Sequence, residues 1–237
     1  MTHRTFWTAV AVLGLTAGSV SADTIVGWNF QGATGNQTST ASSIAASHLT
    51  GLDVTRGSGL TPSAASNAIS ASGWDGTPAA NPADDTQYFQ FGFEVAAGYE
   101  ATLNQLFIGT RSSNTGPGNL GLFTSVDGFA TQVATFTQSG TSYLNSVIDL
   151  SGLGPITGTI LFRIIKLDTV SANGGTVAST GTFRLTNYFD GGDTGSMRIT
   201  GSVRPSSGVI PEPSSIVLMG LGVVGLAGVI RLRRRSV

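Results

Sequence analysis

Alternation of apolar and polar side chains between Tyr88 and Val95 is the feature that most constrains how this chain can fold. The odd-numbered positions hold three phenylalanines and a valine, whereas the even-numbered positions hold Tyr88, Gln90, Gly92 and Glu94. Successive side chains of an extended strand point to opposite faces. The pattern therefore predicts a half-buried antiparallel strand with an aromatic inner face.

Similar runs, rich in Val, Ile, Thr and Phe, recur along the chain and match the preferences of strands. They lie at Thr24–Phe30, Leu103–Gly109, Leu120–Val126, Gln132–Phe136, Asn145–Leu150, Thr159–Asp168, Thr182–Phe189 and Met197–Val203. Both faces of Thr159–Asp168 are largely apolar, which predicts a central strand.

Turn signals separate these runs, among them Asp127-Gly128 and Asn173-Gly174-Gly175. No stretch between the ends of the chain shows ten residues of helical periodicity with caps. We therefore predict an all-β fold, an antiparallel β-sandwich of eight to ten strands in two packed sheets. A jelly-roll-like topology is preferred, and an immunoglobulin-like one is the alternative.

Residues 31–86 differ from the rest because they are rich in Ala, Ser, Thr and Gly. Only Leu49–Arg56 and Ala68–Ser70 resemble strands, and so long a loop is usually functional or disordered. Trp74 is the only tryptophan in this segment. A packing role for its ring is favoured over a role as a sugar platform.

The first 22 residues have the three parts of a secretory signal. Arg4 supplies a basic start, Phe6–Leu15 is apolar, and Val20-Ser21-Ala22 places small residues at the −3 and −1 positions. This order predicts a signal peptide at residues 1–22, cleaved before Asp23.

The opposite end also has three parts. Pro211, Glu212 and Pro213 precede the uncharged run Ile216–Ile230, after which come four arginines, Arg231, Arg233, Arg234 and Arg235. A helix over about residues 214–232 is long enough for a thin membrane span. The arginines act as a membrane stop that stays cytoplasmic, which places residues 23–208 outside the inner membrane.

This tail resembles the PEP-CTERM sorting signal of Gram-negative bacteria over residues 209–237. The resemblance implies that Pro211-Glu212-Pro213 is recognised by an exosortase, a membrane-embedded processing enzyme found in strains that make exopolysaccharide. It further implies passage through the inner membrane, cleavage near Pro211, and delivery to the cell surface, outer membrane or extracellular matrix.

The body resembles the jelly-roll-like outer domains of many PEP-CTERM proteins. The similar stretches are Val54–Leu60, Gly73-Trp74, Tyr88–Phe91, Arg111–Pro117, Ser125–Phe129 and Phe183–Leu185. Such proteins often carry an Asp after the last stretch, where this chain has Thr186. The resemblance carries no assigned activity. We divide the chain into residues 1–22, a strand and low-complexity segment at 23–86, the sandwich body at 87–208, and the sorting signal at 209–237.

Composition excludes several functional classes. The chain has no cysteine, which excludes disulfides, thiol catalysis and cysteine-ligated metals. Residues 23–210 hold seven basic and twelve acidic residues, a net charge of −5 that gives no attraction for nucleic acid. The region has one histidine, His48, and no G-x-S-x-G. No catalytic residue, metal site or cofactor is therefore predicted.

Two carboxylate patterns resemble catalytic signatures but have simpler explanations. Asp193-Thr194-Gly195-Ser196 matches an aspartic-protease consensus, yet no second copy exists and a Gly-rich turn explains it. A glycosidase needs two paired carboxyl groups across a cleft. The candidates are Asp84, Asp85, Glu94, Glu100 and Asp127, and nothing in the sequence pairs them.

We therefore expect a secreted, non-enzymatic surface or matrix protein with a structural or adhesive role. A carbohydrate-binding module, with exopolysaccharide as its partner, is the alternative. Sugar platforms combine an exposed aromatic ring with polar partners, and the candidate glycan contacts are Trp74, Tyr99, Tyr143 and Tyr188. The other expected partners are an exosortase and, transiently, the inner membrane.

Overall fold

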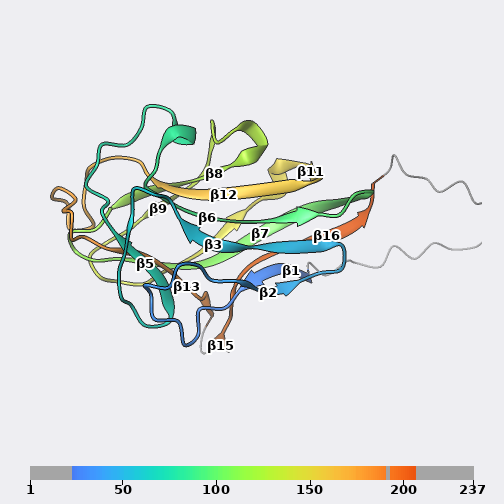
Figure 1. Ribbon diagram of the computed structural model, residues 1–237, viewed down its shortest axis with the longest axis horizontal. Coiled ribbons are helices and arrows are strands. Elements are labelled where there is room, and N and C mark those ends of the chain that lie inside the picture. Colours follow the sequence, from blue (N-terminus) through green and yellow to red (C-terminus); the bar gives the residue numbers. More distant parts are fainter. Residues whose placement is uncertain (1–22, 191–192, 207–237) are drawn as a thin grey trace, which may run out of the picture.

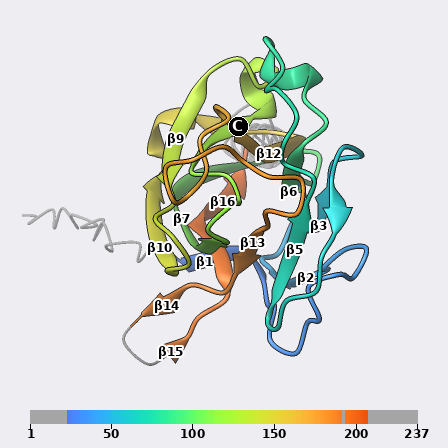
Figure 2. The same cartoon turned by 90° about the vertical axis from the view of Figure 1, so that its left-hand side faces the viewer.

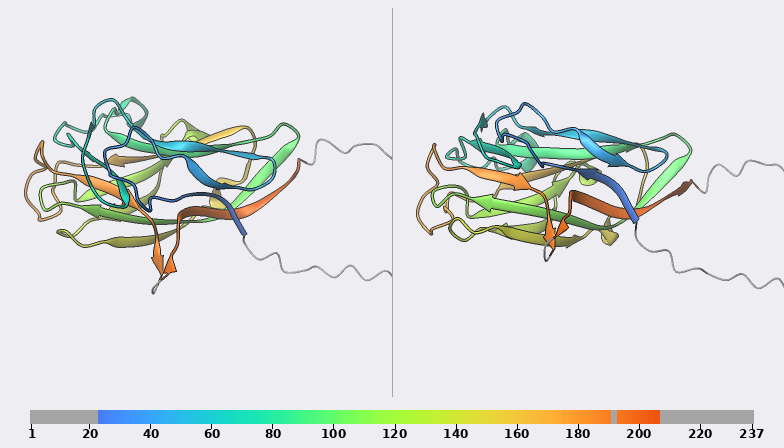
Figure 3. Two further views of the ribbon diagram at one scale, coloured as in Figure 1. Left: turned by 60° about the horizontal axis from the view of Figure 1, so that its bottom comes forward. Right: turned by 90° about the horizontal axis from the view of Figure 1, so that it is seen from below.

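The computed structural model describes residues 23–190 and 193–206. This part of the chain is an all-β sandwich of two antiparallel sheets, with a separate two-stranded hairpin (Figure 1). The two layers are seen from other directions in Figure 3. The predicted fold class is confirmed for these residues. The predicted signal peptide, sorting motif and membrane helix lie outside them.

The larger sheet has nine strands. They are β1 (Asp23–Trp28), β2 (Ser42–Ala45), β4 (Thr61–Pro62), β5 (Ala68–Ser72), β7 (Tyr99–Ser112), β10 (Leu144–Asp149), β11 (Pro155–Ile156), β13 (Phe183–Thr186) and β16 (Met197–Pro205). The long strand β7 organises this sheet. Its residue Thr110 pairs with Leu144 and Leu185, and Phe107 pairs with Val147 and Arg198. Hence β10 lies on one side of β7, and β13 and β16 lie end to end on the other.

The smaller sheet has five strands in the order β3-β6-β12-β8-β9. Their bounds are β3 (Leu49–Arg56), β6 (Tyr88–Val95), β8 (Asn119–Thr124), β9 (Gln132–Thr137) and β12 (Thr159–Lys166). The predicted alternating strand coincides with β6, and Phe89, Phe91 and Phe93 are fully buried. The doubly apolar run forms β12, which is central as expected because β6 and β8 flank it.

The pairing of strands follows a nested order. β8 pairs with β9, β7 with β10, β6 with β12, β5 with β13 and β1 with β16, so each pair encloses the previous one along the chain. Cross-pairing of β7 with β13 and of β8 with β12 rolls this long hairpin into two layers. The result is the connectivity of a jelly roll, the topology preferred from the sequence.

Aromatic rings from both sheets fill the space between the layers. Trp28 meets Phe91 edge-on at 5.3 Å between ring centroids, and Phe91 stacks on Phe162 at the same distance. Toward the other end, Trp74 contacts Phe89 and Phe183 at 5.8 and 5.7 Å. The main core cluster extends from residue 25 to residue 199, so the described part of the chain contains its own core.

Residues 31–86 contain more structure than the sequence pattern indicates. Besides β3 and β5, this segment forms β2, β4 and the 3₁₀ turn η1 (Pro82–Asp84). Arg56 joins its parts because its guanidinium donates to the carbonyls of Gly35, Gln37 and Ser70. Lys166 of β12 donates to the carbonyls of Trp74 and Gly76. These cationic side chains supply the order that apolar alternation does not predict here.

Between β13 and β16 the chain leaves the sheet and forms the hairpin β14 (Phe189–Asp190) and β15 (Asp193–Thr194), which projects from the sandwich (Figure 2). The Asn145 side chain of β10 donates to the Phe189 carbonyl and accepts from the Phe189 amide. The Gly-rich turn predicted between Phe189 and Met197 therefore corresponds to this hairpin, of which residues 191–192 lie outside the described part.

Candidate functional site

A row of polar and aromatic residues crosses the outer face of the nine-stranded sheet. Ser70 of β5 pairs with Arg184 of β13, and Arg184 pairs with Arg111 of β7. Tyr143 directly precedes Leu144, the residue of β10 that pairs with Thr110. The neighbours Phe183 and Leu185 are buried in the core. Since side chains alternate along a strand, Arg184 points outward.

Arg111, Arg184 and Tyr143 form what we call the arginine-pair site. The two guanidinium carbons lie 4.9 and 5.4 Å from the centroid of the Tyr143 ring. Tyr143 is 53% exposed, and Phe189 of the hairpin packs edge-on against it. Burial lowers the pKa of Arg184, Tyr143 opposes this shift, and the nearby charge of Arg111 adds to it. The site is thus an exposed aromatic ring with two cations.

A cavity of about 120 Å³ adjoins this site. Arg111 and Arg184 line it, and most of the other lining residues carry a hydroxyl group. These are Ser70, Ser112, Ser113, Thr141 and Thr182. Within the fold, the Ser112 hydroxyl donates to the Pro117 carbonyl and the Ser113 hydroxyl accepts from the Thr182 amide. The remaining donors and acceptors of the lining suit a ligand that is itself rich in hydroxyl groups.

A second arginine–aromatic cluster lies on the same face, closer to the middle of β7. Arg198 of β16 pairs with Phe107, and its guanidinium lies 4.3 Å from the Phe107 ring and 5.5 Å from the Tyr188 ring. Phe107 and Tyr188 meet edge-on at 5.3 Å. Phe107 and Arg111 are four residues apart on one strand, which places the two clusters about 13 Å apart.

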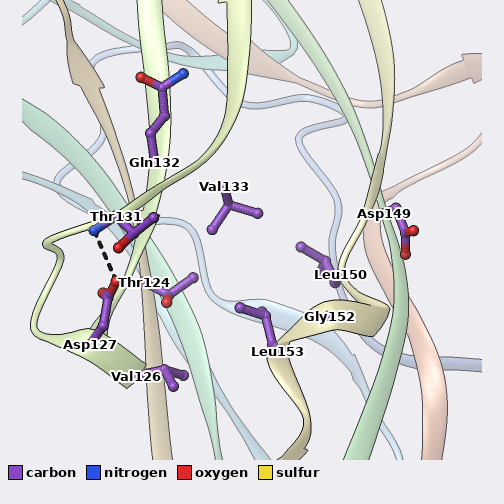
Figure 4. Close-up of a pocket in the computed structure, with 10 residues that line it drawn as sticks. All are labelled: Thr124, Val126, Asp127, Thr131, Gln132, Val133, Asp149, Leu150, Gly152 and Leu153. Atoms are coloured by element: carbon purple, nitrogen blue, oxygen red, sulfur yellow. Dashed lines mark hydrogen bonds between the residues drawn. The ribbon is translucent and has the colours of Figure 1, made fainter.

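Another cavity, of about 490 Å³, is at the open side of the sandwich between β9 and β10. Figure 4 shows Asp127 and Asp149 on opposite sides of it, with Val133, Leu150 and Leu153 between them. None of the residues that line it is aromatic. Its surface is therefore an apolar patch bordered by carboxylates.

Both carboxylates of this side cavity are held by turns. Asp127 follows β8 in the 3₁₀ turn η2 (Ser125–Asp127) and accepts from the amides of Ala130 and Thr131 at 3.1 and 2.8 Å. Asp149 accepts from the amide of Ser151, which begins the 3₁₀ turn η3 (Ser151–Leu153), at 2.9 Å. Hydrogen bonding with Thr131 lowers the pKa of Asp127, and hydrogen bonding with Ser151 lowers the pKa of Asp149. Both groups are therefore ionised at neutral pH.

Three of the other carboxylates considered for glycosidase chemistry make contacts within the fold, whereas Glu94 is exposed on β6. Asp85 accepts from the amides of Ala79 and Gln87, and Asp84 accepts from the side chain of Asn81. Glu100 forms an ion pair with Arg204 at 2.7 Å. Within residues 23–190 and 193–206, no group of three or more His, Cys, Asp or Glu side chains could hold a metal ion.

The structure separates the four aromatic residues predicted as glycan contacts. Trp74 is fully buried, and its indole donates to the Ala71 carbonyl, so it offers no face to a sugar and fills the packing role instead. Tyr99 stacks on His48 at 3.7 Å, which covers one of its faces. Tyr143 and Tyr188 lie on the outer face of the nine-stranded sheet, in the two arginine–aromatic clusters.

The sequence pattern did not identify Arg111 and Arg184 as partners of Tyr143. Both arginines lie in stretches that resemble the outer domains of PEP-CTERM proteins, and this resemblance is the sequence feature that could have pointed to them. Their proximity depends on the pairing of β7 with β13, strands more than 70 residues apart. Such proteins often have an Asp directly after the stretch that corresponds to Phe183–Leu185. Here that position is Thr186, whose hydroxyl donates to the Asn187 carbonyl.

Other predicted features lie beyond the described residues. These are the sorting residues Pro211, Glu212 and Pro213 and the membrane stop at Arg231, Arg233, Arg234 and Arg235. In the part that the structure describes, no helix has the length and apolar character needed to cross a bilayer.

Comparison with known proteins bears on the tail. No curated protein and no solved structure matches the chain. Residues 209–235, however, match the family model of the PEP-CTERM protein-sorting motif. This match confirms the resemblance seen in the sequence, and the motif implies processing by an exosortase and export across the inner membrane toward the cell surface. The chain therefore carries a PEP-CTERM sorting motif at residues 209–235, after an all-β body.

Proposed function

We propose that the sandwich is a non-catalytic module with a structural or adhesive role at the cell surface or in the exopolysaccharide matrix. The proposal combines the sorting motif with the chemistry of the cavity between β9 and β10. The mature protein acts outside the cell, where its jelly roll folds without disulfides because the chain has no cysteine.

The observation that supports a non-catalytic role is the ionised state of the Asp127 and Asp149 carboxyl groups. A glycosidase requires one carboxyl group with a raised pKa, so that it can protonate the leaving oxygen. Turn hydrogen bonds lower the pKa of both groups instead. This favours a role of the two carboxylates in holding turns η2 and η3 over a role in acid catalysis.

A gene deletion in the native host, complemented with the full chain, tests the adhesive role. We expect the deletion strain to lose surface attachment or matrix cohesion, measured by retained biomass under flow. Complementation with the wild-type chain and with an Asp127→Asn, Asp149→Asn double variant should restore it equally. Restoration by the wild type alone, when the double variant is folded and present at the cell surface in equal amount, would contradict the non-catalytic role.

Carbohydrate binding is the second candidate, and the exposed Tyr143 ring supports it. Tyrosine presents a flat apolar surface together with a polar tip, and the adjoining cavity is lined by hydroxyl groups. In this alternative the module adheres because it binds polysaccharide directly. A glycan array probed with the purified protein tests it, and Tyr143→Ala should reduce the signal.

A further inference from the structure

Arg111 and Arg184 are directly opposite one another on adjacent strands. Like charges in this arrangement destabilise a sheet, because the two side chains share one face at close range. The chain holds only seven basic residues between positions 23 and 210. Placing two of them in a repulsive pair therefore lowers stability and calls for a compensating role.

The other basic residues of the body all have hydrogen-bond acceptors. Arg56 and Lys166 donate to backbone carbonyls, and Arg204 pairs with Glu100. Arg163 donates to Gln90 and the Ala83 carbonyl, and Arg198 donates to the Ser196 carbonyl. Arg111 and Arg184 differ from these five. Among the side chains that the structure describes, their only direct partner is the ring of Tyr143.

Two adjacent guanidinium groups with unused donors are suited to an anion. Guanidinium forms paired hydrogen bonds with carboxylate and phosphate groups, and each charge-assisted bond is stronger than a neutral one. A bound anion would also remove the repulsion between the two arginines. The chemistry of the site therefore favours a negatively charged group on the ligand.

The surroundings indicate what carries that charge. The cavity beside the arginines is lined by five hydroxyl-bearing residues, and Tyr143 adds a half-exposed ring. Both features suit a sugar, whose hydroxyl groups need hydrogen-bond partners and whose ring carbons need an apolar surface.

The location of the site disfavours a lipid headgroup. β16 ends at Pro205, which pairs with Tyr99 at the start of β7, and the sorting motif begins four residues later. Arg111 lies near the other end of β7, twelve residues and roughly 40 Å farther along the strand. The arginine-pair site is thus at the end of the sandwich remote from the tail, where it can reach extracellular material.

We propose that Arg111, Arg184 and Tyr143 bind an acidic polysaccharide. The two guanidinium groups hold a carboxylate or phosphate group of the polymer, and the exposed part of the Tyr143 ring contacts a sugar. This inference rests on the proposed adhesive function and specifies the class of ligand that produces adhesion. Because the body carries a net charge of −5, binding depends on the local pair of cations and not on long-range attraction.

Binding to matched polymers tests the proposal. Full-length protein in mild detergent is titrated with polygalacturonate, with its fully methyl-esterified form, and with a phosphomannan, and affinity is measured by microscale thermophoresis. We expect binding to polygalacturonate or the phosphomannan, and at least about tenfold weaker binding to the neutral ester. Binding to the carboxylated polymer alone identifies a uronate site, whereas binding to the phosphomannan alone identifies a sugar-phosphate site.

Variants assign the binding to the site. Arg111→Gln and Arg184→Gln should each weaken it about tenfold or more, and Tyr143→Ala should weaken it as well. Arg204→Gln is the matched control, because it removes the same charge at the opposite end of the sandwich and should leave affinity unchanged. The melting temperature of Arg111→Gln should equal or exceed that of the wild type, since the substitution removes a repulsive pair.

Three outcomes would overturn the proposal. They are equal affinity for the charged and the neutral polymer, an effect of Arg204→Gln as large as that of Arg111→Gln, and no binding to either acidic polymer. None of them contradicts the adhesive function if the deletion strain still loses attachment. If that strain attaches normally while the acidic polymers bind as expected, the adhesive function fails and the binding site stands.

Discussion

Lys166 is the only lysine of the chain, and the residue is only 1% exposed. Its ammonium group donates to the carbonyls of Trp74 and Gly76, so it fixes the loop after β5 against β12. Lys166→Met keeps the length of the side chain but leaves both carbonyls without this donor. We expect the free energy of unfolding to fall by about 1–3 kcal/mol in urea titrations. Arg111→Met, which removes a cation that donates no hydrogen bond within the described structure, should lower it by less than about 0.5 kcal/mol.

The same lysine gives a prediction with pH. Burial lowers the pKa of Lys166, an effect that the carboxylates of Asp85, Asp75 and Asp168 partly oppose. Between this lowered pKa and the ordinary value, the unfolded state binds more protons than the folded state, so this group makes stability rise with pH. The difference in unfolding free energy between wild type and Lys166→Met should therefore increase through that alkaline window. A difference that stays constant or falls would contradict the assigned shift.

Strands were predicted best where apolar side chains alternate. β3 and β6 have the bounds that the sequence indicates. The signal is clearest in β6, whose inward residues are buried phenylalanines and a valine. β2 and β4 show no apolar alternation in the sequence, because nearly all of their residues are exposed and do not enter the core. The arginine-pair site could not be predicted, because the register between β7 and β13 is set by the rolled sheet and not by local sequence.

The hairpin β14–β15 depends on one glycine of β7. A Cβ atom at Gly109 would lie 2.2 Å from the Asn187 carbonyl oxygen and 2.4 Å from the Thr186 hydroxyl. Gly109 therefore lets the chain pass close to β7 as it leaves β13. Gly109→Ala should lower the free energy of unfolding by about 1–3 kcal/mol, measured in urea.

Gly152 is the matched control for this substitution. Nothing lies within 4 Å of a Cβ atom placed there, and its backbone is outside the left-handed region. Gly152→Ala should therefore be neutral or slightly stabilising, since it restricts the unfolded chain. If the two variants have equal stability, the close approach of β13 and β7 is not required for folding.

At the scale of the whole molecule, the jelly roll gives the body two distinct ends. The turn near His48, the turn near Gly98 and the end of β16 are joined by hydrogen bonds, because Ala96 donates to His48 and Ser206 to Gly98. The sorting motif follows from this end, whereas the arginine-pair site is at the other. For a tail that spans the membrane, as the sequence predicts, the first end should face the bilayer and the second should face away from it.

The absence of cysteine allows this orientation to be measured by single-cysteine labelling. Ser47 and Ser142 are exposed positions at the tail end and beside Tyr143, respectively. In cells without exosortase and with a permeabilised outer membrane, a bulky maleimide should modify Ser142→Cys several times faster than Ser47→Cys. In protein released by exosortase the two rates should become similar, because the membrane no longer shields the tail end. Equal rates in both strains would show that the body is not held in this orientation. In that case the arginine-pair site would reach extracellular polymers because the protein is released, and not because the site is far from the tail.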